Sequence, residues 1–125
     1  MDSDSQSVRI LVVDDDSSLA RSMSLVFQVL GYSAVIETDS QVALTRMSED
    51  RFDGLITDVT MPGMDGVELA KRGKQIWPEM FVIFVTGNSK TIPTEAETVA
   101  AAVLTKPFAI DQLKSAIQAS IAGDP

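Results

Sequence analysis

The sequence predicts an α/β domain in which helices cover both faces of a five-stranded parallel sheet. Five short segments are apolar and rich in β-branched residues, and they alternate with segments whose apolar residues recur at helical spacing. Strands that are apolar on both faces are typical of parallel sheets, because helices cover such sheets on both sides. The length of 125 residues suits one domain with a hydrophobic core of its own.

The first half of the chain contains two strand–helix pairs. Val8 to Val13 forms the first apolar run, and a helix follows whose apolar residues reach Leu30. Gly31 comes next, where a helix C-terminus needs a residue that tolerates a positive φ. The second strand covers roughly Ser33 to Glu37. The second helix is marked by three apolar residues, Ala43, Leu44 and Met47.

The second half begins with a strand, a turn and a helix. The strand lies in FDGLITD, residues 52–58, and a helix from about Gly66 to Ile76 follows the turn MPGMDG. Gly73 lies inside this helix, where a glycine is expected to cost about 1 kcal/mol of helix stability relative to alanine. The fourth strand is MFVIFV, residues 80–85.

A short helix, a weak strand and a long helix complete the predicted domain. Thr94 and Glu97 have the spacing of a capping box, which opens the short helix. Ala102 to Leu104 forms the weak fifth strand. The last helix is amphipathic, with apolar residues at Leu113, Ile117 and Ile121.

Composition excludes several classes of function. The chain has no cysteine and no histidine, so disulfides, thiolate metal sites and imidazole catalysis are excluded. The net charge of −8 repels phosphate backbones, which argues against direct nucleic-acid binding. The longest apolar run is too short to cross a bilayer. The start, MDSDSQS, is not a secretory signal, so we expect a cytoplasmic protein without membrane contact.

Chemically active residue types follow the ends of the predicted strands. Asp14 and Asp15 follow the first strand, and Asp58 ends the third. Thr86 follows the fourth strand, and Lys106 follows the fifth. The carboxyl ends of parallel strands meet at one edge of a sheet, where ligands bind in open α/β folds. These residues, remote in sequence, are therefore expected to converge on one site.

The acidic residues at this edge need a compensating positive charge. Asp16 is expected to cap the next helix, but capping leaves Asp14, Asp15 and Asp58 unexplained. Two carboxylates ~4 Å apart repel by ~4 kcal/mol at an effective dielectric constant of about 20. A hard divalent cation held by oxygens fits the cluster, best Mg²⁺ with some waters retained. Lys106 can supply the remaining positive charge.

Four motifs stand at the predicted strand ends, namely ILVVDDDSSL, LITDVTMPGMDG, FVTG and LTKPF. In this order they resemble the receiver domain of bacterial response regulators. The resemblance covers the chain from about Val8 to Ile121. It implies a flavodoxin-like, doubly wound sheet with the strand order 2-1-3-4-5. The receiver domain is expected over residues 8–122, after residues 1–7, which the sequence pattern predicts to be a disordered segment.

The resemblance assigns a role to each acidic residue. Asp58 corresponds to the phosphoacceptor of the family, which takes a phosphoryl group from a histidine kinase or phosphotransfer protein. Asp15 and Asp58 would bind Mg²⁺ directly, with the backbone carbonyl of Thr60, and Asp14 would act largely through water. Asp58 would attack phosphorus as a nucleophile, in a reaction that needs mainly positioning and charge neutralisation.

Two further residues complete the set that the resemblance implies. Thr86 would supply the hydroxyl that follows the phosphoryl group, and Lys106 the cation that contacts it. The Lys106–Pro107 peptide bond would be cis. Phosphorylation would then switch contacts with a downstream protein or effector domain. A phosphorylation-dependent homodimer is compatible with the same resemblance.

Three features depart from the family pattern. The family usually has an aromatic residue three positions before the lysine, where this chain has Val103. The spacing between Thr86 and Lys106 is slightly short, so NSKTIPTEAETVAA is expected to encode a short or displaced fourth helix. Gly73 stands where the pattern has an aliphatic residue. Because the small side chain of Val103 cannot sweep like a ring, we expect activation to be read mainly around the fourth helix.

Two alternatives remain open at this level. A pseudo-receiver would be an interaction module that is never phosphorylated, and the complete set of site residues argues against it. A small Mg²⁺-dependent phosphohydrolase of the haloacid dehalogenase type would carry its nucleophile after the first strand and would usually need a substrate cap, which has no counterpart here. We therefore expect no enzyme beyond self-catalysed phosphoryl transfer and autodephosphorylation. The sequence does not decide between a single-domain regulator and the receiver of a longer regulator or hybrid kinase.

Overall fold

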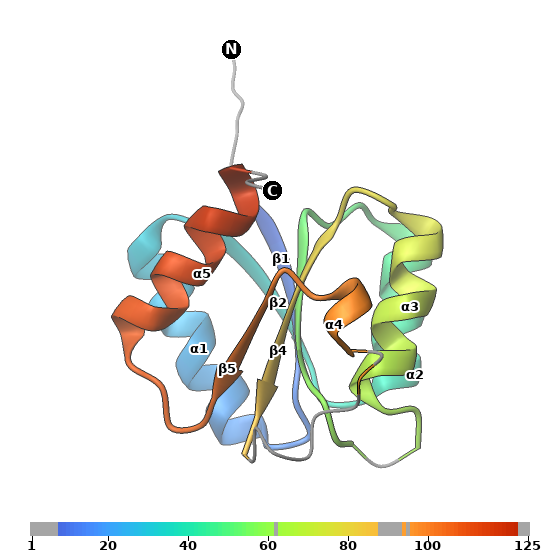
Figure 1. Cartoon of the computed structure of the whole chain (residues 1–125), viewed down its shortest axis with the longest axis horizontal. Helices are drawn as coiled ribbons and strands as arrows, with labels where there is room; N and C mark the ends of the chain where they lie inside the picture. Colours follow the sequence, from blue (N-terminus) through green and yellow to red (C-terminus); the bar gives the residue numbers. More distant parts are fainter. Residues whose placement is uncertain (1–7, 62, 88–93, 95, 123–125) are drawn as a thin grey trace.

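Five parallel strands form one sheet in the order β2-β1-β3-β4-β5, which confirms the predicted fold class and strand order. The structure is a computed structural model that describes residues 8–61, 63–87, 94 and 96–122. The disorder predicted for residues 1–7 lies outside the described residues. The strands are drawn as arrows in Figure 1, and their carboxyl ends lie at its lower edge.

Helices and strands alternate along the chain, as predicted. In order, they are β1 (Arg9–Val13), α1 (Ser17–Leu30), β2 (Ser33–Glu37), α2 (Ser40–Glu49), β3 (Gly54–Asp58), α3 (Gly66–Ile76), β4 (Phe81–Thr86), α4 (Ala96–Val99), β5 (Ala102–Thr105) and α5 (Ile110–Ala122). The four residues of α4 confirm a short fourth helix within the described part of the chain. The capping box predicted for it involves the Glu97 side chain, which lies outside that part.

The third strand begins later than the sequence predicts. Phe52 and Asp53 precede β3, which starts at Gly54. The reason is that the Asp53 carboxylate accepts the Arg9 N–H at 2.9 Å, while the Asp53 N–H donates to the Arg9 carbonyl at 2.8 Å. Phe52 is buried, and the Arg9 guanidinium lies 4.9 Å from the centre of its ring. The Asp53 carboxylate thus takes the Arg9 N–H, which the backbone of a longer third strand would otherwise bond.

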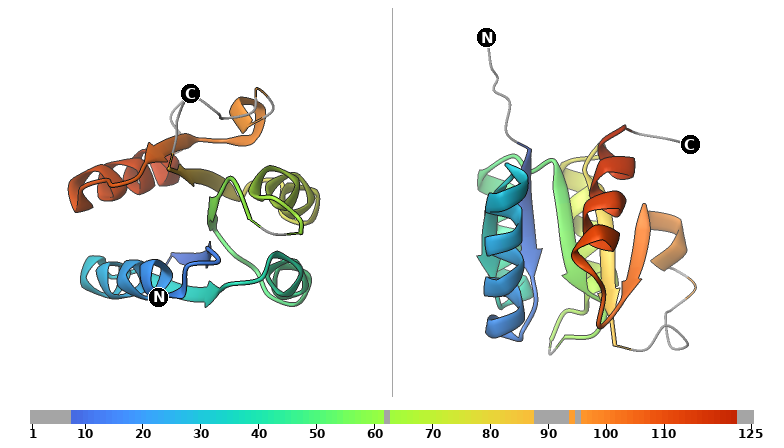
Figure 2. Two further views of the ribbon diagram at one scale, coloured as in Figure 1. Left: turned by 90° about the horizontal axis from the view of Figure 1, so that it is seen from below. Right: turned by 90° about the vertical axis from the view of Figure 1, so that its left-hand side faces the viewer.

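The sheet separates two hydrophobic cores. Helices α1 and α5 cover one face, and α2, α3 and α4 cover the other (Figures 1 and 2). Successive strand residues point to opposite faces, so each buried strand contributes to both cores. Thus Leu11 and Val13 pack under α2 and α3, whereas Ile10 and Val12 pack under α1 and α5. This double burial is why the strands are apolar throughout.

Aspartates begin three of the helices. The side chains of Asp16, Asp39 and Asp65 accept hydrogen bonds from N–H groups in the first turns of α1, α2 and α3. These bonds satisfy amides that have no partner inside the helix. At the other end of α1, Gly31 has φ 85°, as a left-handed C-terminal residue should. The predicted capping role of Asp16 is confirmed.

Gly73 lets α3 approach two methionines closely. It is buried, and a Cβ at this position would lie 2.8 Å from Met47 Sδ and 2.9 Å from Met80 Cε. Trp77, at the end of α3, donates its indole N–H to the Met47 carbonyl at 2.8 Å. Gly73 therefore lowers the stability of α3 as a helix but allows tight packing between α2 and α3.

Gly66 brings the start of α3 against the end of β3. Its N–H donates to the Val59 carbonyl at 2.9 Å, and a Cβ on it would collide with the backbone carbonyl of Asp58. A backbone atom cannot swing aside as a side chain does. Glycine at this position therefore sets the path of the chain immediately after Asp58.

One smaller expectation is also met. The Lys106–Pro107 peptide bond is cis. Among the described residues, every helix is too short or too polar to cross a membrane.

Replacing Gly66 by alanine should lower the free energy of unfolding by about 1–3 kcal/mol, because the added methyl group overpacks against backbone. Urea denaturation checks this. Gly87→Ala is the matched control, since a Cβ there meets no atom of the described residues within 4 Å. Equal stabilities of the two variants would contradict the proposed role of Gly66.

Candidate functional site

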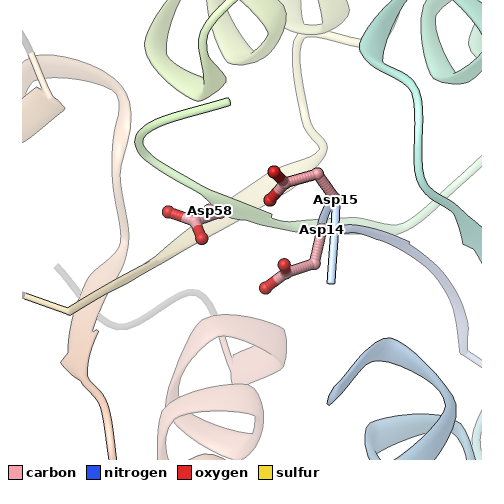
Figure 3. A group of neighbouring side chains, drawn as sticks. All are labelled: Asp14, Asp15 and Asp58. Atoms are coloured by element: carbon pink, nitrogen blue, oxygen red, sulfur yellow. The ribbon is translucent and has the colours of Figure 1, made fainter. Parts of the chain in front are cut away.

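The predicted site residues converge at the carboxyl edge of the sheet. Asp14 and Asp15 follow β1, Asp58 ends β3, and β1 lies beside β3 in the sheet. Thr86 ends β4, and Lys106 follows β5 on the other side. Figure 3 shows the three carboxylates side by side over the strand ends, although Asp58 is far from the other two in sequence.

Asp14 is the most deeply buried acidic residue of the site. Its exposed fraction is 2%, and each carboxylate oxygen has a partner. The Asp16 N–H donates to Oδ1 at 2.9 Å, and Lys106 Nζ donates to Oδ2 at 3.1 Å. Burial raises the pKa of the Asp14 carboxyl, and these two hydrogen bonds offset only part of that rise.

Lys106 bridges two carboxylates. Its Nζ lies 2.9 Å from Asp58 Oδ2 and 3.1 Å from Asp14 Oδ2. Burial lowers the pKa of the Lys106 ammonium group, but hydrogen bonds to Asp58 and Asp14 outweigh that effect and leave the pKa raised. Lys106 is therefore charged at neutral pH and compensates charge on both strands.

Asp58 is held by the lysine on one oxygen and by the backbone on the other. Its side chain is 14% exposed, and the Thr60 N–H donates to Oδ1 at 3.1 Å. The family resemblance implies a role for the Thr60 carbonyl, whereas the bond described here comes from its amide. The metal-binding role of that carbonyl stays a prediction.

The three aspartates form a compact oxygen cluster. One carboxylate oxygen from each of Asp14, Asp15 and Asp58 lies within 4.8 Å of the others. Asp15 is exposed, so the cluster opens to solvent on its side. Oxygen donors suit a hard cation such as Mg²⁺. Lys106 offers one positive charge against three negative ones, so the residues present fit a divalent cation.

Thr86 lies between the strand that carries Asp58 and the strand that leads to Lys106. It is buried, and its carbonyl accepts the Lys106 N–H at 2.7 Å. In the sheet it pairs with Thr105 of β5, and the preceding Val85 pairs with Asp58. The backbone of Thr86 thus fixes where the lysine stem begins.

Sequence reasoning missed the backbone groups that orient the acidic side chains. The amides of Asp16 and Thr60 bond to Asp14 and Asp58, each two residues earlier in the chain. An aspartate that turns back onto the amide two residues later is a common local motif, so this signal was available. The contact of Gly66 with the Asp58 carbonyl has only the turn MPGMDG as its signal.

Comparison with known families gives the same assignment as the geometry. A family profile described as "Response regulator receiver domain" matches residues 10–118. The chain belongs to this family. The resemblance stated from the four motifs is thereby confirmed, and the protein is a receiver domain of two-component response regulators.

This receiver domain matches nearly the whole length of one curated relative and about half the length of another. It is 34% identical over 112 residues to the response regulator receiver protein CpdR of Brucella abortus, covering 88% of this chain and 93% of that protein. It is also 34% identical over 115 residues to the response regulator MprA of Mycobacterium bovis. That match covers 90% of this chain and 50% of MprA, so the chain spans about half of such relatives.

Solved receiver structures have the same fold. A CheY-like receiver domain protein from Methanospirillum hungatei superposes with a TM-score of 0.89 at 26% identity, covering 94% of this chain and 96% of that one. The chemotaxis response regulator CheY4 of Vibrio cholerae gives a TM-score of 0.82 at 30% identity, covering 92% and 99%.

The receiver domain keeps Val103 at the position expected for an aromatic residue. Val103 is partly buried, pairs with Phe84 in the sheet and packs against the core under α2 and α3. Its side chain is therefore part of the packing between the sheet and these helices. How activation is read at this position stays a prediction.

Lys106→Met should lower the free energy of unfolding by about 1–3 kcal/mol, because it leaves two partly or fully buried carboxylates without their cation. Urea denaturation without divalent cations measures the change. The matched control is Lys114→Met on the exposed side of α5, which should change stability by less than about 0.5 kcal/mol.

Adding Asp14→Asn to the Lys106→Met variant should recover part of the loss, since one buried charge is removed. If Lys106→Met is as stable as the control, charge compensation by Lys106 does not hold this edge together.

Proposed function

We propose that this receiver domain accepts a phosphoryl group on Asp58, with Mg²⁺, and thereby switches its contacts with other proteins. The observation that carries the proposal is the position of Lys106 Nζ, within hydrogen-bond distance of Asp58 and of the buried Asp14. An exposed third carboxylate, Asp15, lies in the same oxygen cluster. A cation and an oxygen cluster around one nucleophile are the parts that phosphoryl transfer needs.

In the proposed reaction, an oxygen of Asp58 attacks the phosphorus of a phosphohistidine or a small phosphodonor. A new O–P bond forms as the bond from phosphorus to the donor atom breaks, and the donor atom keeps the electron pair. The product is an acyl phosphate on Asp58. Lys106, which already contacts Asp58, offsets negative charge on the transferred group.

The residues that would hold the metal are those of the oxygen cluster. Asp15 and Asp58 would bind Mg²⁺ directly with the Thr60 carbonyl, and Asp14 largely through water. When bound, Mg²⁺ would offset the charge of the carboxylates and of the phosphoryl oxygens. Because both oxygens of Asp14 already have protein partners, an indirect role suits it best.

The signal would arise from the new charge. A phosphoryl group adds roughly −1.5 to −2 charge relative to a neutral side chain. At Asp58, the anionic phosphoryl group would replace the carboxylate as the partner of Lys106, and the Thr86 hydroxyl would follow the phosphoryl group. Because the Thr86 carbonyl holds the Lys106 amide at 2.7 Å, movement at one strand end is transmitted to the other.

The proposed partners are proteins. A histidine kinase or phosphotransfer protein would supply the phosphoryl group, and a downstream protein or effector domain would read the change. We place the domain in the cytoplasm, without direct contact to nucleic acid or membrane. Its only chemistry would be self-catalysed phosphoryl transfer and autodephosphorylation, so it would not act as an enzyme on other substrates.

The two alternatives fit the site less well. A haloacid dehalogenase-type phosphohydrolase would place its nucleophile after the first strand. Of the two acids there, Asp14 is 2% exposed with both oxygens bonded, and the exposed Asp15 is not among the carboxylates that Lys106 contacts, which are Asp14 and Asp58. A pseudo-receiver would need no acceptor, cation and acidic cluster in contact. These observations favour the phosphoacceptor reading over both.

Acetyl phosphate with Mg²⁺ should add one phosphoryl group to the protein, and Asp58→Asn should abolish the addition, since the nucleophilic oxygen is lost. Intact-mass measurement detects the product. Asp111→Asn, on the exposed first turn of α5, removes one carboxylate away from the site and should label like the parent. Labelling of Asp58→Asn to the extent of the parent would remove Asp58 from its assigned role.

Mg²⁺ should raise the melting temperature of the unphosphorylated protein, because it relieves repulsion among Asp14, Asp15 and Asp58. Asp15→Ala should abolish this effect and should itself stabilise the metal-free protein. Differential scanning fluorimetry across a Mg²⁺ titration tests both outcomes. Glu79→Ala is the control, because Glu79 is exposed and lies outside the cluster. A metal-free Asp15→Ala protein that is less stable than the parent would show that the cluster is not electrostatically strained.

A further inference from the structure

Thr57 places a buried hydroxyl directly before Asp58. Four polar side chains are buried among the described residues, namely Asp14, Ser40, Thr57 and Thr86. Thr57 is 1% exposed and, by the alternation along β3, points with Leu55 towards the core under α2 and α3. A valine would fill much the same space without a buried polar atom, so packing alone does not explain the hydroxyl.

The hydroxyl of Thr57 holds one end of the peptide group that follows Asp58. It donates to the Asp58 carbonyl at 3.0 Å. At the other end of this peptide group, the Val59 N–H donates to the Val85 carbonyl of β4 at 3.1 Å. Because a peptide group is planar, bonds at both of its ends fix the direction in which it faces.

The Asp58 carbonyl lies beyond the end of the ladder between β1 and β3. The peptide bond after Asp58 is trans, so its carbonyl points away from β4, towards the side on which β1 lies. However, β1 pairs with β3 only as far as Val13 opposite Thr57, and the next amide, that of Asp14, donates to Glu37 of β2. The Thr57 hydroxyl therefore satisfies a carbonyl where strand pairing has ended.

The start of α3 lies against the same carbonyl. A Cβ on Gly66 would collide with it and would lie 3.1 Å from the Thr57 hydroxyl oxygen. The Gly66 N–H also donates to the Val59 carbonyl at 2.9 Å. Hence Thr57 bonds the Asp58 carbonyl, and Gly66 bonds the carbonyl that follows it. Both bonds come immediately before Thr60.

This bonded segment carries groups on which the proposed chemistry depends. The Asp58 carboxylate stands on the residue whose ψ angle the peptide group sets, and the Thr60 amide bonds that carboxylate at 3.1 Å. The Thr60 carbonyl is a proposed metal ligand. A rotation of the peptide group would therefore move both groups relative to Asp14 and Asp15, which follow β1.

We propose that Thr57 is a positioning residue for the metal and phosphoacceptor site. Its hydroxyl fixes the peptide group after Asp58 and so sets where the Asp58 carboxylate and the Thr60 carbonyl lie in the oxygen cluster. Thr57 acts through these groups, since its own side chain points into the core. Its effect on Mg²⁺ and on phosphoryl transfer rests on the proposed function, whereas its effect on the backbone can be measured in the metal-free protein.

Three substitutions at Thr57 separate the hydroxyl from packing. Thr57→Val and Thr57→Ala both remove the hydroxyl, and only the second also leaves a smaller side chain. Thr57→Ser keeps the hydroxyl and differs from Thr57→Ala in that group alone. Thr45→Val is the matched control, since Thr45 is exposed on α2 and its hydroxyl bonds the Gln41 carbonyl within the helix. Urea denaturation ranks the stabilities of the four variants and shows that each is folded.

The Thr60 amide reports the position of the backbone without metal. In ¹H–¹⁵N NMR spectra of the metal-free protein, its proton resonance should move to higher field in Thr57→Val and Thr57→Ala, because its bond to Asp58 weakens. Thr57→Ser and Thr45→Val should keep the resonance of the parent. Equal movement in all three Thr57 variants would contradict a role for the hydroxyl.

Magnesium affinity tests the consequence for the site. Groups that orient metal ligands from behind typically change affinity by about 10- to 100-fold. A Mg²⁺ titration in the same spectra should therefore give a dissociation constant raised roughly tenfold in Thr57→Val and Thr57→Ala, and unchanged in Thr57→Ser and Thr45→Val. Labelling by acetyl phosphate, followed by intact mass, should need correspondingly more Mg²⁺ for half its maximal rate. A merely structural role would instead make affinity follow stability, so that Thr57→Ser would weaken together with Thr57→Ala.

Two results would overturn the positioning role. One is the Mg²⁺ affinity of the parent in both Thr57→Val and Thr57→Ala, and the other is a Thr57→Ser protein weakened as much as Thr57→Ala. A parent that neither binds Mg²⁺ nor is labelled on Asp58 would overturn the proposed function, and with it the role of Thr57 at the metal. The Thr60 resonance would then still decide whether Thr57 positions the backbone.

Discussion

The carboxyl edge of this sheet depends on one lysine. Lys106 contacts Asp58, which ends β3, at 2.9 Å and Asp14, which follows β1, at 3.1 Å. Without it, a buried carboxylate and a largely buried one would face each other with no cation among the described residues around them. The carboxylates come together because a parallel sheet gathers its strand ends at one edge. Lys106, in the loop after β5, compensates their negative charge. The same contact leaves Asp58 beside a positive charge, as a phosphoacceptor needs.

The backbone around the acceptor is fixed before any ligand arrives. The Thr60 amide holds one oxygen of Asp58, and Gly66 allows the start of α3 to lie against the Asp58 carbonyl. In the same way, the Asp16 amide donates a hydrogen bond to one oxygen of Asp14. Asp15 differs, because it is exposed. The site therefore combines two acids that the protein orients with one that faces solvent, where a hydrated cation would enter.

Much of this could be predicted from the sequence, for physical reasons. Strands buried on both faces must be apolar throughout, so their alternation with helices could be recognised in the sequence. The carboxyl ends of parallel strands meet at one edge of the sheet, so the sequence also predicted that Asp58 lies near Lys106. The start of β3 was predicted wrongly, because the Asp53 carboxylate takes the Arg9 N–H that the backbone of a longer strand would bond. The packing of Gly73 against Met47 and Met80 could not be predicted either, since helix propensity says nothing about which neighbour needs the space. The exposed apolar residues of α1 could not be predicted either, because they recur at the same helical spacing as the residues that pack in the core.

The central claim is that Asp58, compensated by Lys106, forms a phosphoacceptor site that requires a divalent cation. The most direct measurement is ¹⁹F NMR of the protein with beryllofluoride, which mimics a phosphoryl group on a carboxylate. The account predicts bound fluoride resonances that appear only with Mg²⁺ and are absent in Asp58→Asn. A folded parent protein that shows no bound resonance with Mg²⁺, or an Asp58→Asn protein that shows the same resonances, would contradict it.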